Sequence, residues 1–317
     1  VVNLAATRVW GDIDVFGRNK RLEAVYCQNM DLKGDIRSFE HLTLLTYVDM
    51  SFTKVAGDVA VFAGKQFLHT LKLASTRVFG DIGDLVSWDN VFEVLELSST
   101  SVAGNVWVFQ HASYLKELYL ADTQVTGSMD GILHWEKVQV VDLSKTKVEG
   151  RLTRRWRGCC KELRTLRLSG SEVRFIPAGE DRVDLLQLPQ FLHPEEASLQ
   201  LLPALTTLEV SGCQLQGPVS DLLLPLAFCE HLGSVLARES GLTGDLPTTD
   251  PLPAFSVGVA GIVNDIRSPL SNSLEVLDLS GCSHPTRVAL NRLVLEQAAS
   301  PAGGECANQS LPCKSVD

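Results

Sequence analysis

Residues 71–82 read "LKLASTRVFGDI", and close copies of this stretch recur at a nearly constant spacing through the first half of the chain. "LELSSTSVAGNV" begins at Leu95, "LYLADTQVTGSM" at Leu118 and "VDLSKTKVEGRL" at Val141. Successive glycines of the pattern are 23 or 24 residues apart, at Gly11, Gly34, Gly57, Gly80, Gly104, Gly127 and Gly150. This period predicts a solenoid, because one repeat cannot bury its apolar face alone and must stack on its neighbours.

Each copy fits the pattern L-x-x-L-x-L-x-x-T-x-V-x-G with conservative replacements. The L-x-L portion predicts a short strand, since alternate residues of a strand point to the same face. The threonine is expected where the chain turns away from this strand, with its hydroxyl bonded to local backbone groups. The glycine is expected where the turn needs a positive φ or where a neighbouring coil approaches closely.

A second apolar column follows each glycine by five residues, at Phe16, Phe39, Phe62, Leu85, Phe109 and Ile132. Stacked one per coil, these residues predict a largely aromatic spine on the convex side of the core. The segment between each glycine and the next leucine shows little helical periodicity. We therefore expect short 3₁₀ or irregular turns there.

This pattern resembles the leucine-rich repeat, and most of all its plant-specific subtype, L-x-x-L-x-L-x-x-N-x-L-x-G-x-I-P. The T-x-V-x-G-D variant is similar to repeats of algae and other protists, with threonine in place of the usual asparagine. The resemblance covers roughly residues 1–290. It implies an α/β solenoid, a horseshoe with a parallel concave sheet of about 11–13 short strands. It also implies a non-catalytic recognition module, part of a larger receptor or signalling protein.

The array is regular over residues 1–175 and irregular over 176–285, where two gaps of 42 residues separate Leu166 from Leu208 and Val235 from Leu277. Each gap holds either a long loop or a degenerate repeat. "VDLLQLPQF" at 183–191 and "LPAFSVGV" at 252–259 favour hidden repeats, since long structureless loops are uncommon in compact arrays. Residues 286–300 have helical periodicity and are expected to form a capping helix. Residues 301–317 are expected to form a flexible tail.

The outward positions of the predicted concave sheet are the candidate binding site. They interleave aromatic and charged side chains, a composition typical of protein-binding surfaces. The predicted partner-binding residues are Tyr26, Tyr47, Asp49, Lys72, Glu96, Tyr119, Asp142 and Arg167. The alternative is a solvated sheet face without a ligand.

A second candidate surface is a basic cluster in residues 145–167, which hold nine basic residues against two acidic ones. Such a cluster can dock an acidic partner, although charge runs are more often only solvated. Its central members are Arg151, Arg154, Arg155, Arg157 and Arg164.

Four aspartates follow the glycines directly, at Asp12, Asp35, Asp58 and Asp81. A column of carboxylates either binds a cation such as calcium or accepts hydrogen bonds from turn amides. We expect no metal site. Of the eight cysteines, Cys27, Cys213 and Cys282 fall in core columns and are expected to be buried thiols. Whether Cys306 and Cys313 are bonded stays open.

The composition excludes several functional classes. The net charge of −10 argues against nucleic acid as a partner, and no apolar run is long enough to cross a bilayer. No set of nucleophile, base and orienting residue appears, so neither an enzyme nor a cofactor is expected. The chain opens inside a repeat, so we expect its natural N-terminus upstream. The cysteine pattern favours the cytoplasm slightly over the cell exterior.

Three functions remain. The leading one is binding of a protein or peptide ligand on the concave face. The second is a structural subunit or scaffold of a larger assembly. The third is ice or surface binding through the T-x-V array, which requires the threonines to point outward. The oligomeric state stays open.

Overall fold

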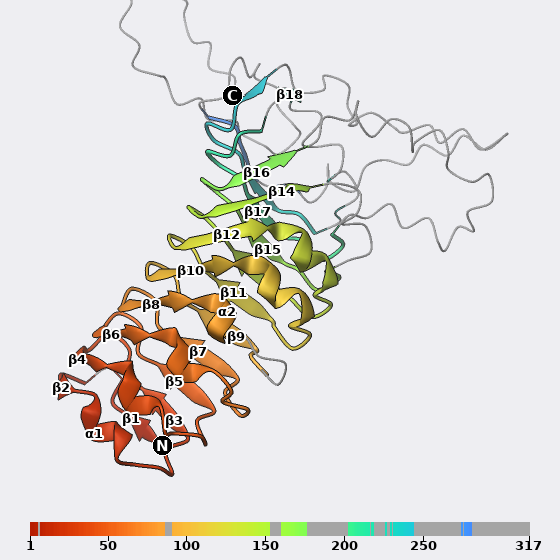
Figure 1. Cartoon of the computed structure of the whole chain (residues 1–317). Coiled ribbons are helices and arrows are strands. Elements are labelled where there is room, and N and C mark those ends of the chain that lie inside the picture. Colours follow the sequence, from red (N-terminus) through yellow and green to blue (C-terminus); the bar gives the residue numbers. More distant parts are fainter. Residues whose placement is uncertain are drawn as a thin grey trace, which may run out of the picture.

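The computed structural model describes residues 1–5, 7–85, 91–152, 160–175, 202–215, 217–218, 226, 229, 231–243, 274 and 276–280. In this part of the chain each repeat forms one coil, and the coils stack in a single column (Figure 1). The N-terminal coils, drawn in red and orange, lie at one end of the column and the later, green coils follow in sequence order. This confirms the predicted solenoid.

The sheet predicted as concave, here called the long sheet, has eleven parallel strands among the described residues. Consecutive coils pair in one register, so that Val48, Leu71 and Leu95 are direct neighbours. The strands, in spatial order, are β1 (Val2–Asn3), β3 (Ala24–Tyr26), β5 (Tyr47–Asp49), β7 (Thr70–Lys72), β9 (Val94–Glu96), β11 (Glu117–Tyr119), β13 (Val140–Asp142), β15 (Thr165–Arg167), β17 (Thr207–Glu209), β19 (Ser234–Leu236) and β21 (Val276–Asp278).

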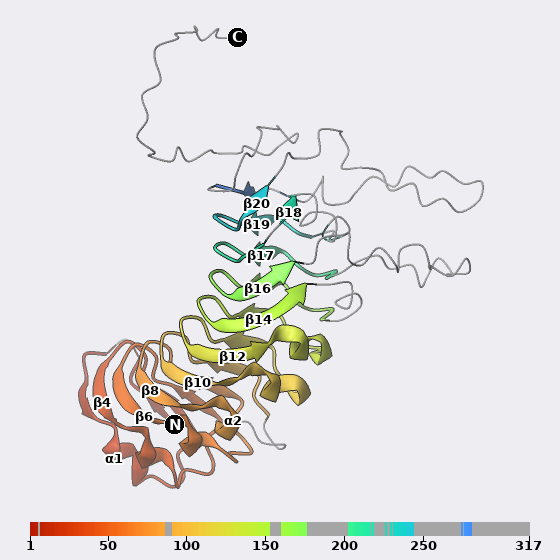
Figure 2. The same cartoon turned by 45° about the horizontal axis from the view of Figure 1, so that its top comes forward.

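A second parallel sheet, here called the flank sheet, was not predicted from the sequence. It is built from the T-x-V-x-G-D segments and runs along one side of the column (Figure 2). Its eight strands are β2 (Trp10–Asp12), β4 (Asp31–Asp35), β6 (Lys54–Asp58), β8 (Arg77–Asp81), β10 (Ser101–Asn105), β12 (Gln124–Ser128), β14 (Lys147–Leu152) and β16 (Glu172–Phe175). Farther on, β18 (Gly217–Pro218) pairs with β20 (Leu242–Thr243).

The third side of the column consists of short turns of helix, as predicted. Four of those in the described residues are 3₁₀ helices and two are single α-helical turns. They are α1 (Asp14–Gly17), η1 (Ile36–Phe39), η2 (Val59–Phe62), α2 (Ile82–Leu85), η3 (Val106–His111) and η4 (Met129–His134).

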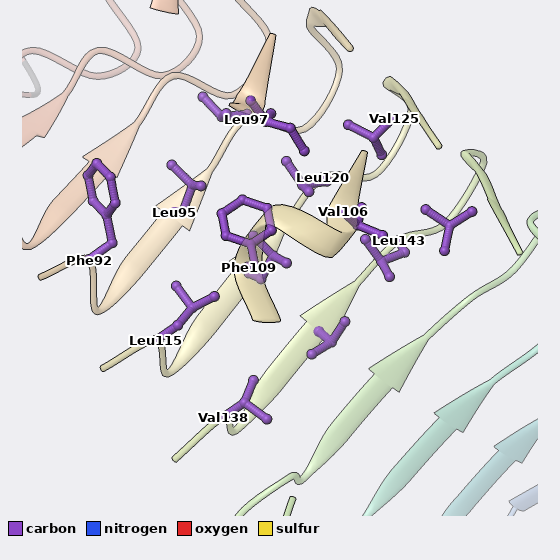
Figure 3. Close-up of a cluster of buried hydrophobic side chains, with 14 of the residues drawn as sticks. Phe92, Leu95, Leu97, Val106, Phe109, Leu115, Leu120, Val125, Val138 and Leu143 are labelled. Carbon is purple, nitrogen blue, oxygen red and sulfur yellow. The ribbon is translucent and has the colours of Figure 1, made fainter. Parts of the chain in front are cut away.

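The core lies between these three sides. Figure 3 shows Leu95 from the long sheet, Phe109 from η3 and Val125 from the flank sheet as parts of one cluster of buried side chains. The predicted aromatic spine is present, because Phe39 and Phe62 are fully buried and their ring centroids lie 6.3 Å apart. Phe16 extends it at 6.4 Å from Phe39. One apolar stack therefore continues from coil to coil.

The threonine column is buried and satisfies the backbone, as predicted. Thr76 Oγ1 donates a hydrogen bond of 2.6 Å to the carbonyl oxygen of Leu73, and Thr100 makes the same bond to Leu97. In later coils Ser171 and Ser240 replace threonine and make the equivalent bond. Each hydroxyl pairs a carbonyl that the turn would otherwise leave unbonded.

The glycine column is explained by both proposed causes together. Gly80 has φ +120°, and a Cβ built on it would lie 2.2 Å from Asp58 Oδ1 of the preceding coil. Asp58 Oδ1 in turn accepts a hydrogen bond of 2.9 Å from the backbone N–H of Ala60. The aspartates therefore bond turn amides, and each fills the space beside the next glycine. No group of three or more potential metal ligands occurs in the described residues.

The hidden repeats that we expected in the two 42-residue gaps are wrong as strands of the long sheet. Leu166 of β15 pairs directly with Leu208 of β17, and Val235 of β19 pairs directly with Leu277 of β21. These strands are therefore neighbours in the long sheet, and residues 183–191 and 252–259 lie outside the described residues. The composition of such apolar segments does not reveal whether they join a sheet, because buried strands and other buried segments look alike.

Several predictions fall outside the described residues. They are the capping helix over 286–300, the tail over 301–317, and the state of Cys282, Cys306 and Cys313. The chain's division into a regular and an irregular array stays a prediction over 176–285.

Candidate functional site

The long sheet presents a continuous outward face, because each of its three-residue strands has a buried leucine or valine at its centre. The first and third residues of each strand point outward. Seven of the eight predicted binding residues occupy the third position of consecutive strands, namely Tyr26, Asp49, Lys72, Glu96, Tyr119, Asp142 and Arg167. Tyr47 occupies the first position of β5. The structure thus places all eight on one face.

Tyr26 and Tyr47 form the aromatic centre of the N-terminal part of this face. Their rings are stacked, with centroids 4.4 Å apart and planes 25° apart. Both side chains are half-buried. Burial, followed by the charges of Asp49 and of Glu96, raises the pKa of the Tyr47 phenol. The Tyr47 phenol is therefore neutral and lies near the carboxylates of Asp49 and Glu96.

The acidic residues near this pair differ in their surroundings. Asp49 is 8% exposed, and its Oδ1 accepts a hydrogen bond of 3.0 Å from the backbone N–H of Ser51. Glu96 forms an ion pair of 3.5 Å with Lys72. The burial of Asp49 limits its access to a ligand, so its role in binding stays a prediction.

Tyr119 lies three coils beyond Tyr47 and has a different partner. Its hydroxyl donates a hydrogen bond of 3.2 Å to Glu117 Oε2. Burial, together with the charge and hydrogen bond of Glu117, raises the pKa of Tyr119 to about 12. This tyrosine is held by its own strand neighbour and does not stack on a second ring.

The C-terminal part of the face is dominated by ion pairs. Arg167 Nε donates to Glu209 Oε1 at 2.9 Å, and its Nη1 lies 3.9 Å from Asp142 Oδ2. The hydrogen bond from Arg167 to Glu209 raises the pKa of the guanidinium. Arg238 pairs with Asp278 farther along the sheet. Charge on this part of the face is compensated within the protein.

Sequence reasoning missed residues at the edge of the face. Glu93 and Lys116 precede β9 and β11 and form an ion pair of 2.8 Å. Glu23 occupies the equivalent place before β3 and is exposed. These residues share one position in the repeat, directly before each strand, and alternation within the strand does not extend to that position.

The basic cluster is only partly described. Arg164 is exposed and lies directly before β15. Arg151 belongs to β14, but its side chain and the whole of Arg154, Arg155 and Arg157 lie outside the described residues. Its role in docking stays a prediction.

The cysteines that can be placed are buried. Cys27 and Cys213 lie in the core as predicted, and Cys160 and Cys229 are buried as well. Burial raises the pKa of the Cys27 and Cys229 thiols to about 11. The described helices are all too short to cross a membrane.

The chain is similar in fold to several solved structures. The Arabidopsis receptor kinase HAESA, in complex with the peptide hormone IDA and the co-receptor SERK1, matches with TM-score 0.61 and 22% identity over 78% of this chain and 38% of that chain. The LRR ectodomain of the Arabidopsis thaliana receptor kinase GASSHO1/SCHENGEN3 matches with TM-score 0.60 and 18% identity over 93% of this chain and 38% of that one. A plant ice-binding protein matches with TM-score 0.59 and 21% identity over 92% and 81%.

These likenesses show the fold. The chain is a leucine-rich repeat solenoid, as the repeat pattern predicted. It spans 38% of the length of each of the two receptor structures. No protein-family model matches the chain, and no curated protein matches it.

Proposed function

We propose that the outward face of the long sheet binds a protein or peptide ligand. The observation that carries this proposal is the row of aromatic and charged side chains that the sheet holds in register on one open face. The stacked coils already hold the backbone of this row in place. This chain should therefore lose little conformational entropy when a ligand binds. The receptor structures of similar fold support the proposal, because HAESA was solved in complex with a peptide hormone and GASSHO1/SCHENGEN3 in complex with CASPARIAN STRIP INTEGRITY FACTOR 2.

A steric test separates the long sheet from the flank sheet. The chain would be immobilised and used to select binders from a library of random linear peptides of about 12 residues. Binding of the selected peptides would then be measured against Thr70→Trp, on the outward face of β7, and Ala103→Trp, on the outward face of β10. Both changes add the same ring to a strand surface.

The proposal predicts that Thr70→Trp weakens binding by roughly tenfold or more, as expected when a contact at the centre of an interface is obstructed. Ala103→Trp should leave affinity within about twofold. Thermal unfolding of both variants would confirm that they are folded. The opposite ranking, or a failure to select any peptide, would overturn the proposal.

We further propose that the chain is the recognition region of a larger receptor or signalling protein and that it uses the same face for this. A structural subunit or scaffold is the alternative, in which the side with the short helices also binds partners. Cross-linking mass spectrometry on the native assembly distinguishes them. Cross-links confined to the long-sheet face fit recognition, whereas cross-links spread over η1–η4 fit a scaffold.

Ice binding is a second candidate, because a plant ice-binding protein is among the structures of similar fold. The threonine array does not support it. Thr53, Thr76, Thr100, Thr123 and Thr146 are each at most 9% exposed and donate to backbone carbonyls. We therefore expect no thermal hysteresis in freezing measurements, and a clear hysteresis gap would restore this candidate.

A further inference from the structure

The N-terminal and C-terminal parts of the long-sheet face differ in how their negative charges are compensated. We propose that Tyr26 and Tyr47, with Glu23 beside them, form a subsite for a lysine or arginine side chain of the bound ligand. This proposal rests on the proposed function, since it names the chemistry that the same face would recognise. It commits to a basic, extended peptide segment as the occupant.

The aromatic pair supplies the first element of the subsite. The two rings stack at 4.4 Å across adjacent strands β3 and β5, and both remain partly exposed. The face of a tyrosine ring carries partial negative charge and attracts an ammonium or guanidinium group within about 6 Å. The chain itself contains this geometry elsewhere, where Lys137 Nζ lies 5.4 Å from the centroid of the Tyr114 ring.

Unpaired negative charge supplies the second element. Glu23 is exposed and takes part in none of the ion pairs among the described residues, and neither does Asp49. The carbonyl oxygen of Glu23 accepts hydrogen bonds of 2.7 Å from the N–H of Thr46 and 3.3 Å from that of Tyr47. The backbone of Glu23 is thus hydrogen-bonded to Tyr47 of the next coil, whose register partner is Ala24.

The basic residue that follows these tyrosines in the outward column, Lys72, already has a partner. Lys72 follows Asp49 in the same column, but its ammonium group pairs with Glu96. Asp49 is buried with a backbone N–H as its described partner, and a buried carboxylate without a counter-charge is costly. Two further acceptors on these coils, Gln28 Oε1 and Ser51 Oγ, are buried without a hydrogen-bond partner among the described residues. A cation bound over the exposed faces of the tyrosine rings would offset the charge of Asp49 through space, without contacting the buried carboxylate.

Farther along the face, several carboxylates form ion pairs with lysine or arginine residues of the protein. Glu93 pairs with Lys116, while Asp142 and Glu209 share Arg167. Asp278 pairs with Arg238. Because these carboxylates already hold a cation of the protein, a basic ligand gains least there and most at the tyrosine pair. The net charge of −10 would also draw a basic ligand toward the molecule.

A thermodynamic cycle on a selected peptide tests the subsite. From the peptides that Thr70→Trp weakens, one with an arginine or lysine essential for binding is chosen. Its arginine is replaced by citrulline, which keeps the shape and removes the charge, or its lysine by norleucine. Both peptides are measured by calorimetry against the wild type, Tyr47→Ala, Tyr47→Phe and Glu23→Gln. Tyr114→Ala is the matched control, a tyrosine outside the long sheet.

The proposal predicts that loss of the peptide's charge weakens binding to the wild type by roughly 5- to 30-fold, the range of a partly desolvated cation–π contact. The same replacement should cost little against Tyr47→Ala, because the two groups act as a pair. Tyr47→Phe keeps the ring and should retain the effect. Glu23→Gln should reduce both affinity and its dependence on salt.

Different results would refute the basic-side-chain subsite and the peptide-binding function of the long-sheet face. Peptides that bind the long-sheet face without arginine or lysine would refute the subsite and leave the proposed function standing. A charge effect that is equal in the wild type, Tyr47→Ala and Tyr114→Ala would also refute it. Peptides that Thr70→Trp does not weaken, or no peptides at all, would refute the proposed function and the subsite together.

Discussion

The coils up to residue 152 and those from residue 160 onward keep the same long sheet but differ in the extent of the flank sheet and in the outward face. In the first region most glycines of the repeat pack beside a polar side chain of the preceding coil, as Gly80 does beside Asp58 and Gly127 beside Asn105, whereas Gly150 packs against Met129. In the second region the flank sheet ends at β16, and only β18 and β20 pair beyond it among the described residues. Yet β15 and β17, whose central leucines are 42 residues apart in sequence, pair in the standard register.

This difference shows which part of the repeat is indispensable. The three-residue strand of the long sheet alone maintains the stacking, because it supplies both the sheet hydrogen bonds and the buried leucine or valine. The flank sheet accompanies the long sheet as far as β16, including coils in which asparagine, serine or arginine follows the glycine, so it does not depend on the aspartate. The same two regions differ on the outward face, which carries a tyrosine pair in one and arginine bridges in the other.

The largest expected effect comes from breaking the glycine–aspartate contact. Gly80→Ala should lower the free energy of unfolding by roughly 2–5 kcal/mol, because it adds both backbone strain and a clash with Asp58. Gly64→Ala is the control, since Gly64 has φ +66° and no neighbour within 4 Å of a Cβ. It should cost roughly 1–2 kcal/mol.

Urea unfolding of Gly80→Ala alone and combined with Asp58→Ala would measure the coupling. The double variant should recover part of the loss, since the clash disappears while the strain remains. If the two changes in the free energy of unfolding were strictly additive, contact with Asp58 would not be the reason that residue 80 must be glycine.

A second large effect is expected at Lys65, which is 4% exposed. Its Nζ donates to the carbonyl oxygens of Phe39, Glu40 and Leu42 of the preceding coil, at 3.0, 3.2 and 3.3 Å. Burial lowers the pKa of this ammonium group. Lys65→Met should cost roughly 2–3 kcal/mol, because it leaves buried carbonyls unbonded.

The measurement at Lys65 is the unfolding midpoint in urea of the Lys65→Met variant beside that of Lys116→Met, whose lysine lies at the surface in an ion pair. The surface variant should cost less than about 1 kcal/mol. Equal losses at the two sites would contradict the capping role of Lys65.

Buried thiols in both regions predict a loss of stability at high pH. The pKa of Cys27 in the first region and of Cys229 in the second rises from 9.0 to about 11 on burial. The unfolded chain therefore loses these protons first, and unfolding becomes more favourable as the pH rises from about 9 to 11. Below about pH 9 the thiols are protonated in both states, and their contribution to the free energy of unfolding is fully present.

Thermal unfolding as a function of pH would test this for Cys27→Ala and Cys229→Ala separately. Each variant should show a shallower decline between pH 9 and 11 than the wild type. Unchanged slopes in both variants would show that other groups cause the alkaline loss.

The smallest expected effect is a gain of stability at Phe52. This residue has φ +59° and is 56% exposed, in a turn position that other coils fill with Asn29, Ser75, Ser99 or Asp122. Bulky side chains are strained there, whereas asparagine tolerates this backbone. Phe52→Asn should stabilise the first region by about 1 kcal/mol in urea unfolding, and Phe67→Asn, an exposed phenylalanine outside these positive-φ turns, should not.

Much of the fold follows from periodicity. The leucine and threonine columns and the aromatic spine could be predicted because each coil repeats the same environment, so that Thr76, Thr100 and Thr123 report one position. The flank sheet could not be predicted, because its strands alternate a buried valine with a glycine of positive φ, which does not resemble an ordinary strand. The direct pairing of strands across the two 42-residue gaps could not be predicted either, because the spacing of apolar residues alone does not determine which strands pair.

The candidate face was predicted in outline and not in detail. Alternation placed Tyr26, Lys72 and Glu96 outward, but it did not show that Lys72 and Glu96 pair with each other. It also did not show that Asp49 is buried, since that depends on the size of the neighbouring side chains. Glu23 was missed because it precedes the strand.

The most direct measurement is photo-cross-linking of a selected basic peptide to the chain with benzoylphenylalanine at position 47 or, as control, at position 114. Mass spectrometry would identify the peptide residue joined at each position. The account predicts cross-links from position 47 to residues beside the peptide's arginine or lysine, and none from position 114. Cross-links from position 114 alone, or from position 47 to segments remote from any basic residue, would contradict it.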